Sequence, residues 1–186
     1  MLKFQNKITI LLASLLFAGC SASSIKDEIV KDNVPIKENN VINNLTSDID
    51  RAVSRHNEIR AEVFNGSSVV WSDTVATTAQ DYANYLANTG NWEHDISSGY
   101  GENLYVTSEN PSYEEAINYW YQEKKNYNYE NNSCNGTCGH YTQIIWKDTT
   151  EIGCGKAIYT TGNMKNWTVV VCRYNPAGNY IGDRPY

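Results

Sequence analysis

The sequence predicts one domain that mixes α-helices and β-strands. Three stretches between residues 47 and 123 carry apolar residues at the spacing of amphipathic helices, and two β-prone runs follow Trp146. The chain has 186 residues, of which 41% are hydrophobic, so it has room for one ordinary domain and a tail. The formal net charge of -6 argues against a nucleic-acid partner.

Residues 1–19 are interpreted as an export signal. Lys3 and Lys7 precede a short apolar run, and the stretch LFAGC that ends at Cys20 resembles the lipobox of bacterial lipoproteins. Cleavage before Cys20 would then leave an acylated cysteine, and N-terminal acyl chains would hold the protein at the membrane of a bacterial cell envelope. Ordinary secretion into the extracellular space, with cleavage near Ala22, is the alternative. Residues 20–46 are interpreted as a flexible tether, and residues 47–186 as the domain.

The first helix is expected from about Ser47, which can cap it, to Val63. Its apolar face carries Ile49, Ala52, Val53, His56, Ile59 and Val63. His56 therefore falls on the buried face, where we expect a packed histidine tied by a hydrogen bond. Residues 69–71 are expected to be extended.

The second helix is expected from Asp73, as its cap, to about Asn88, with Gly90 closing it. Its inward face carries Val75, Ala76, Ala79, Tyr82, Ala83 and Leu86. An irregular stretch with Trp92 and His94 follows. The tetrapeptide GENL at residues 101–104, taken alone, is interpreted as a turn.

The third helix is expected to start at Asn110 and Pro111, with proline at the first helical position. It aligns Tyr113, Ala116, Ile117, Trp120 and Glu123 on one side. A carboxylate on a buried stripe needs a partner or must take up a proton. Either Lys124 or Lys125 could turn back to pair with Glu123, or a cationic or metal partner could lie inside a cleft.

The tail of the chain is predicted to be a β-hairpin. Residues 151–159 and 167–174 are rich in β-formers, and Thr161, Gly162 and Asn163 separate them. Folding the hairpin about residue 163 places Cys154 opposite Cys172, and a disulfide there would contribute about 3 kcal/mol. Of the five cysteines, Cys20 is set aside as the expected acylation site, so this pairing leaves Cys134 with Cys138.

The stretch CNGTCGHYTQIIW at residues 134–146 places a histidine beside a short loop bracketed by cysteines. His140 and Ile144 would share one face of a helix, with His140 in its first turn. The positive end of the helix dipole favours the neutral histidine, which can bind a ligand. A structural histidine held by hydrogen bonds is the alternative.

Four segments together resemble the CAP superfamily, or SCP domain, which includes the cysteine-rich secretory proteins, the antigen 5 proteins and the plant pathogenesis-related group one proteins. GHYTQIIW at 139–146 fits the first signature of the family, and VVVCRYNPAGNY at 169–180 fits the second. HNEIR at 56–60 and GENL at 101–104 fit two shorter blocks, and the ending at 176–186 resembles the plant group one type. The resemblance covers about residues 48–186 and implies a three-layer α-β-α sandwich with a central antiparallel sheet.

The resemblance implies a cleft with two histidines and two glutamates, which match His94, Glu102, Glu123 and His140. In such a cleft His94 and His140 can bind a divalent metal such as zinc directly, while the carboxylates either coordinate it or fix water and the orientation of the rings. The alternative is a polar, hydrogen-bonded cleft without metal. The chain has four cysteines in the domain where the plant proteins usually have six. The loop before the first signature, which is mobile in sterol-binding relatives, is closed here by Cys134 and Cys138.

We therefore expect a monomeric, non-enzymatic binding module for a lipid, a peptide or a wall component. One alternative is a metal-dependent hydrolase in which Glu102 or Glu123 acts as the general base. The chain contains no HExxH motif, and it shows no serine or thiol nucleophile paired with a histidine. A structural protein of the envelope is a further alternative.

Overall fold

The computed structural model of the 186-residue chain describes residues 47–64 and 68–186. The expected signal peptide, Cys20 and the tether lie outside the described residues. Within them, no helix combines the length and the apolar character needed to cross a bilayer.

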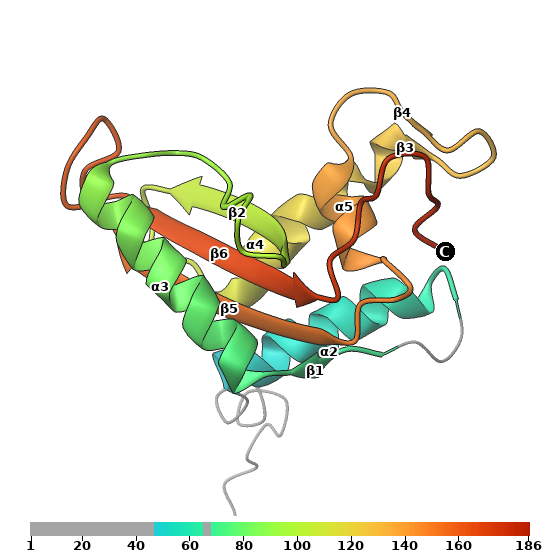
Figure 1. Cartoon of the computed structure of the whole chain (residues 1–186), viewed down its shortest axis with the longest axis horizontal. Coiled ribbons are helices and arrows are strands. Elements are labelled where there is room, and N and C mark those ends of the chain that lie inside the picture. Colours follow the sequence, from blue (N-terminus) through green and yellow to red (C-terminus); the bar gives the residue numbers. More distant parts are fainter. Residues whose placement is uncertain (1–46, 65–67) are drawn as a thin grey trace, which may run out of the picture. The chain divides into compact units, whose positions relative to one another are not determined.

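The centre of the domain is a four-stranded sheet in the order β1-β5-β6-β2 (Figure 1). Strand β6 (Thr168–Asn175) is antiparallel to both of its neighbours, β5 (Glu151–Ile158) and β2 (Gly101–Thr107). The short edge strand β1 (Val70–Trp71) instead pairs with β5 in parallel. The predicted central antiparallel sheet is thus confirmed for three strands, and β1 departs from it.

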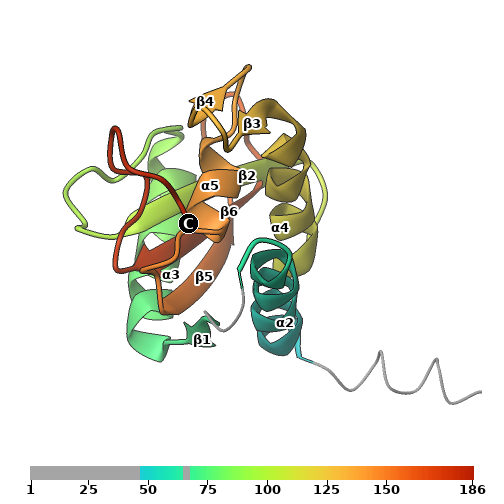
Figure 2. The same cartoon turned by 90° about the vertical axis from the view of Figure 1, so that its right-hand side faces the viewer.

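Helices cover both faces of the sheet, which confirms the three-layer prediction (Figure 2). Helix α3 (Asp73–Thr89) packs on one face through Ala79, Ala83 and Leu86. On the other face lie α2 (Asp48–Ala61), α4 (Tyr113–Tyr121) and the short α5 (Gly139–Ile144). A 3-10 helix η1 (Gln122–Asn126) and a small hairpin, β3 (Tyr127–Asn128) with β4 (Ser133–Cys134), connect α4 to α5.

Two glycines in β5 let α3 lie directly against the sheet. A Cβ atom on Gly153 would be 2.6 Å from Cα of Ala76, and one on Gly155 would be 2.8 Å from Cβ of Gln80. Any larger side chain at either position would therefore push the helix away.

Two of the predicted helix starts are wrong by one or two residues. Asp73 is the first residue of α3 and not its cap, because the N-cap is Ser72 and the Asp73 carboxylate accepts a hydrogen bond from Trp71 Nε1. Helix α4 begins after Ser112 and not at Pro111, because Ser112 and Glu115 form a capping box.

The cap at Ser47 and the closing glycine at Gly90 are confirmed. The prediction of a packed His56 is confirmed too: Nδ1 lies 2.8 Å from the Ala52 carbonyl oxygen, and Nε2 lies 3.1 Å from the hydroxyl of Tyr174. Burial lowers the pKa of His56 to about 4, so the ring is neutral at pH 7.

The interpretation of residues 101–104 as a turn is wrong, because these residues open strand β2. Their pairing with β6 sets Glu102 opposite Arg173 and Leu104 opposite Val171. On its other edge β6 pairs with β5, and the register places Cys154 opposite Cys172. These two cysteines form the predicted disulfide.

Candidate functional site

Glu123 and His140 form the first of two histidine–glutamate pairs. Glu123 lies on η1 rather than on the stripe of α4, and its Oε1 is 2.6 Å from His140 Nδ1. Its Oε2 accepts the backbone N–H groups of His140 at 2.9 Å and Tyr141 at 3.4 Å. The partner of Glu123 is therefore His140 and not a lysine, since Lys124 turns away to pair with Glu62 at 2.6 Å.

The imidazole of His140 is held from a second side by Trp120. The two rings are 6.0 Å apart between centroids, with an interplanar angle of 22°, and Trp120 Nε1 donates to the Leu104 carbonyl oxygen in β2. The ring of His140 is thereby fixed between a carboxylate and an indole that is anchored to the sheet.

His94 and Glu102 form the second pair. His94 lies in the segment after α3, and its Nδ1 is 2.8 Å from Oε1 of Glu102, whose side chain is only 4% exposed. The backbone N–H of Asp95 donates to the same carboxylate oxygen. Arg173, in β6, approaches Oε2 of Glu102 through Nε and Nη2 at 3.4 Å and pairs with Asp95 at 2.6 Å.

Sequence reasoning missed Arg173 and Asp95. The signal for Arg173 was present, because one arginine interrupts the apolar run VVVC of a central strand, and a buried charge needs a partner. Burial opposes ionisation of Asp95, but hydrogen bonds from Ser97 and Arg173 outweigh it, so the pKa of Asp95 is lowered. The buried guanidinium of Arg173 compensates the negative charges of the Asp95 and Glu102 carboxylates.

The two pairs lie on either side of the edge strand β2. Side chains alternate along a strand, so Glu102 faces the side of α3 while Asn103 faces α5. The Asn103 amide donates to the backbone oxygen of His140 at 3.1 Å and to the Tyr174 hydroxyl at 3.1 Å. Consecutive residues of β2 thus contact both pairs.

Among residues 47–64 and 68–186, no hydrogen bond or ion pair joins one pair to the other, and no three His, Cys, Asp or Glu side chains lie close enough to share an ion. The structure brings His94 to Glu102 and His140 to Glu123. It does not bring all four into one cluster in which the carboxylates could act as ligands.

The hydrogen bonds determine which ring nitrogen is available. A carboxylate only accepts, so in both rings Nδ1 carries the hydrogen and donates to the glutamate. In a neutral imidazole Nε2 then carries the lone pair, and no described residue donates to Nε2 of either ring. Histidines that bind metals have this arrangement, in which an acid orients the ring through the other nitrogen.

Comparison with known proteins decides the family. The family model of the cysteine-rich secretory protein family, CAP, matches residues 53–174. The chain belongs to the CAP family.

The CAP domain is also similar to individual members of the family. It is 39% identical over 134 residues to pathogenesis-related protein 1 of Arabidopsis thaliana, covering 72% of this chain and 80% of that protein. It is 40% identical to pathogenesis-related leaf protein 4 of Solanum lycopersicum, over 70% of this chain and 79% of that protein. The solved structure of venom allergen-like protein 4 of Schistosoma mansoni aligns with a TM-score of 0.61 and 27% identity, over 76% and 95% of the two chains.

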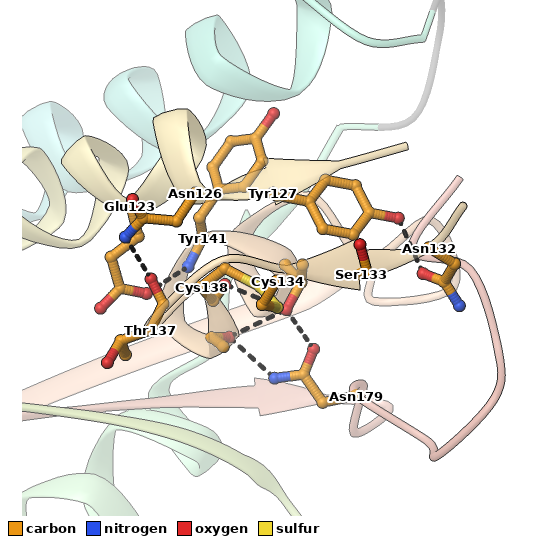
Figure 3. Close-up of a disulfide and its surroundings, with 12 residues drawn as sticks. Glu123, Asn126, Tyr127, Asn132, Ser133, Cys134, Thr137, Cys138, Tyr141 and Asn179 are labelled. Atoms are coloured by element: carbon orange, nitrogen blue, oxygen red, sulfur yellow. Dashed lines mark hydrogen bonds between the residues drawn. A yellow bond between two sulfur atoms is a disulfide. The ribbon is translucent and has the colours of Figure 1, made fainter. Parts of the chain in front are cut away.

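A second disulfide closes the loop of the CAP domain that leads to His140. Cys134 and Cys138 are joined as predicted, and the segment is tied on both sides (Figure 3). The Asn126 amide donates to the Thr137 carbonyl oxygen at 2.7 Å, and the Asn179 amide donates to that of Gly139 at 2.8 Å. These contacts fix the backbone immediately before the histidine.

Proposed function

We propose that this CAP-family chain is a non-enzymatic binding module whose His94 and His140 take a divalent cation such as zinc. The observation that carries the proposal is the pair of imidazoles with Nδ1 engaged by Glu102 and Glu123 and with Nε2 available. Neutral imidazole nitrogen is a preferred zinc ligand, and a carboxylate on the other nitrogen strengthens it.

In the proposed site the two imidazoles, one from each side of the edge strand β2, bind the cation, and the carboxylates orient the rings. Both oxygens of Glu102 and both oxygens of Glu123 already accept hydrogen bonds from described residues. When bound, zinc would supply positive charge and open positions for water or a ligand. The remaining positions give the module a means of holding an anionic or carbonyl-bearing ligand.

The same contacts weigh against the hydrolase alternative. A general base needs a carboxylate oxygen free to take a proton from water, whereas the oxygens of Glu102 and Glu123 are engaged. The four cysteines of the domain are oxidised in two disulfides and offer no thiolate.

The proposal keeps the export route inferred from the leader. Acylated Cys20 and the tether at 20–46 would hold a monomeric domain at a membrane of the bacterial envelope, with secretion as the alternative. The ligand would be a lipid, a peptide or a wall component met at that surface.

Calorimetric titration with zinc tests the site. We expect His94→Ala and His140→Ala each to weaken zinc binding by at least about tenfold, while Glu109→Gln, which changes an exposed carboxylate that bonds to no described side chain, leaves it unchanged. Undiminished binding in both histidine variants would rule out these ligands. Glu102→Gln and Glu123→Gln should still bind zinc, but more weakly than the unchanged chain. These substitutions alter the orientation of the imidazole rings and not the ligating nitrogen atoms.

The hydrolase alternative is tested on the same proteins. Mixed peptide and ester libraries incubated with the zinc-loaded chain should remain intact. Cleavage that disappears in Glu102→Gln or Glu123→Gln would replace the binding module with an enzyme.

A further inference from the structure

Helix α3 presents the half-buried Tyr82 and the exposed Tyr85 next to His94. Thr78, Asp81, Tyr82 and Tyr85 follow one another at helical spacing, and with Asp95 and Arg173 they line a shallow hollow of about 360 Å³. An adjoining hollow of about 350 Å³ shares Tyr82, Tyr85 and Asp95 with it and extends to Glu93, His94 and Ile96. We call these two adjoining hollows the tyrosine surface.

The two tyrosine rings are stacked, and only the inner one has a cation. Their centroids are 5.6 Å apart at an interplanar angle of 16°. The guanidinium of Arg173 lies 5.1 Å from the centroid of Tyr82, whereas Tyr85 has no cation near its ring among the described residues. Tyr85 is 47% exposed, so the outer ring can still receive a flat cationic group.

The charges around the rings are predominantly negative. Asp81, Glu93 and Asp95 line the surface, and among the lysines and arginines of the described residues only Arg173 lines it, compensated by Asp95 and Glu102. Burial raises the pKa of Tyr82 to about 12, with added contributions from the negative charges of Glu102, Glu93 and Asp95. The surface therefore favours a positive group over a neutral or negative one.

Asp81 lies one helical turn before Tyr85, and its carboxylate makes no hydrogen bond or ion pair with a described residue. A group that stacks on the ring of Tyr85 would come within reach of this carboxylate. Ile96, at 98% exposure, supplies an apolar contact at the far end of the surface. Aromatic ring, carboxylate and aliphatic side chain together match an arginine side chain with an apolar neighbour.

We propose that the tyrosine surface is a binding site for peptides that carry an arginine, with the guanidinium stacked on Tyr85 and paired with Asp81. The inference rests on the proposed binding role and names its ligand class as a cationic peptide. Arginine is favoured over lysine because its planar guanidinium can lie parallel to the ring while it donates to a carboxylate. A saccharide could also stack on an exposed tyrosine, but it would leave the negative charge uncompensated.

The experiment is an NMR chemical-shift titration of the purified full chain with the blocked peptide acetyl-Gly-Arg-Leu-Gly-amide. The matched probe replaces arginine by citrulline, which keeps the shape and removes the charge. We expect the arginine peptide to shift the amides around Tyr85, to bind at least about fivefold more tightly than the citrulline peptide, and to weaken as salt is raised.

Two variants test the named side chains. Tyr85→Ala should weaken the arginine peptide about fivefold and Asp81→Asn about threefold. The matched control is Tyr119→Ala, which removes an equally exposed helical tyrosine that also packs against a second tyrosine but lies on α4. Both tyrosine substitutions are at exposed positions, and circular dichroism of each variant verifies that the fold is kept.

Several results would overturn the inference. These are equal affinity for the arginine and citrulline peptides, no binding of either, or an effect of Tyr85→Ala no larger than that of Tyr119→Ala. A tetramer of N-acetylglucosamine that shifts the same amides while the arginine peptide does not would make the surface a saccharide site. Zinc titration of the same samples separates the two proposals, because normal zinc binding without peptide binding removes this inference and leaves the metal site.

Discussion

Arg60 provides a stability test whose size can be worked out from its contacts. Arg60 lies in the last turn of α2 and is 1% exposed. Its guanidinium donates to the carbonyl oxygens of Ile144 and Trp146 at 2.8 Å and of Thr149 at 3.0 Å. It also lies 5.0 Å from the ring centroid of Phe64. Burial lowers the pKa of Arg60 to about 10, so it stays protonated at pH 7.

Arg60→Met keeps much of the volume and removes the donors. The buried carbonyl groups of Ile144 and Thr149 would then lack a donor among the described residues, at about 1–3 kcal/mol each, while that of Trp146 keeps the Thr149 backbone N–H and loses one of two hydrogen bonds, at about 1 kcal/mol. Removing the desolvated cation recovers part of this cost. We expect a net loss of about 4 kcal/mol in the free energy of unfolding, which corresponds to roughly 10 to 20 °C in Tm for a domain of this size.

Urea unfolding followed by tryptophan fluorescence measures the change. Arg60→Lys keeps the charge but has a single nitrogen in place of the planar guanidinium. It should therefore lose about half as much free energy of unfolding as Arg60→Met. A loss below about 1 kcal/mol for Arg60→Met would refute the reasoning, because it would mean that water or a rearranged loop satisfies the carbonyl groups of Ile144 and Thr149 without cost.

Three further predictions concern the core and the disulfides. For His56 the pKa is about 4 in the folded state and 6.5 in the unfolded chain, so about 3 kcal/mol of stability is present above pH 6.5 and is lost as the pH falls to 4. The free energy of unfolding, measured at several pH values, should fall in this range, and His56→Gln should abolish that dependence. Gly153→Ala should cost at least about 1–3 kcal/mol, because its Cβ meets the backbone of α3, and an unchanged melting temperature would contradict that close approach. Replacing both Cys154 and Cys172 by alanine should cost about 3 kcal/mol, against about 2 kcal/mol for the shorter loop closed by the other disulfide, and the reverse order in denaturant unfolding would argue against the chain-entropy account.

The features that the sequence predicts well depend on local spacing. Ser47 is predicted as the cap of the first helix from its position just before the apolar stripe, and its side chain accepts the Asp50 backbone N–H as an N-cap does. Cys154 and Cys172 are equidistant from the centre of a hairpin, so the register follows from the turn. His56 is placed correctly because a helical period of 3.6 residues puts it on the same face as Ala52 and Ile59.

The features that it predicts poorly depend on contacts between distant segments. The tetrapeptide at residues 101–104 looks like a turn because it begins with glycine and carries two polar residues, yet pairing with β6 makes it part of a strand. Helical spacing puts Glu123 on the stripe of the third helix, but the chain tightens into η1 after Tyr121, and the Glu123 carboxylate contacts His140, seventeen residues further along.

Strand β2 shows why no compact sequence motif identifies the candidate site. The strand contributes Glu102 to one side of the sheet and Asn103 to the other, so one step along the chain reaches two different layers of the domain. The histidines that meet these layers come from a loop after α3 and from α5, and each is oriented by a glutamate that lies at a different distance along the chain. Sequence spacing records only that His94 and Glu102 are eight residues apart and that Glu123 and His140 are seventeen apart. The two pairs flank a common strand only after β2 has joined β6, and this pairing depends on the whole sheet.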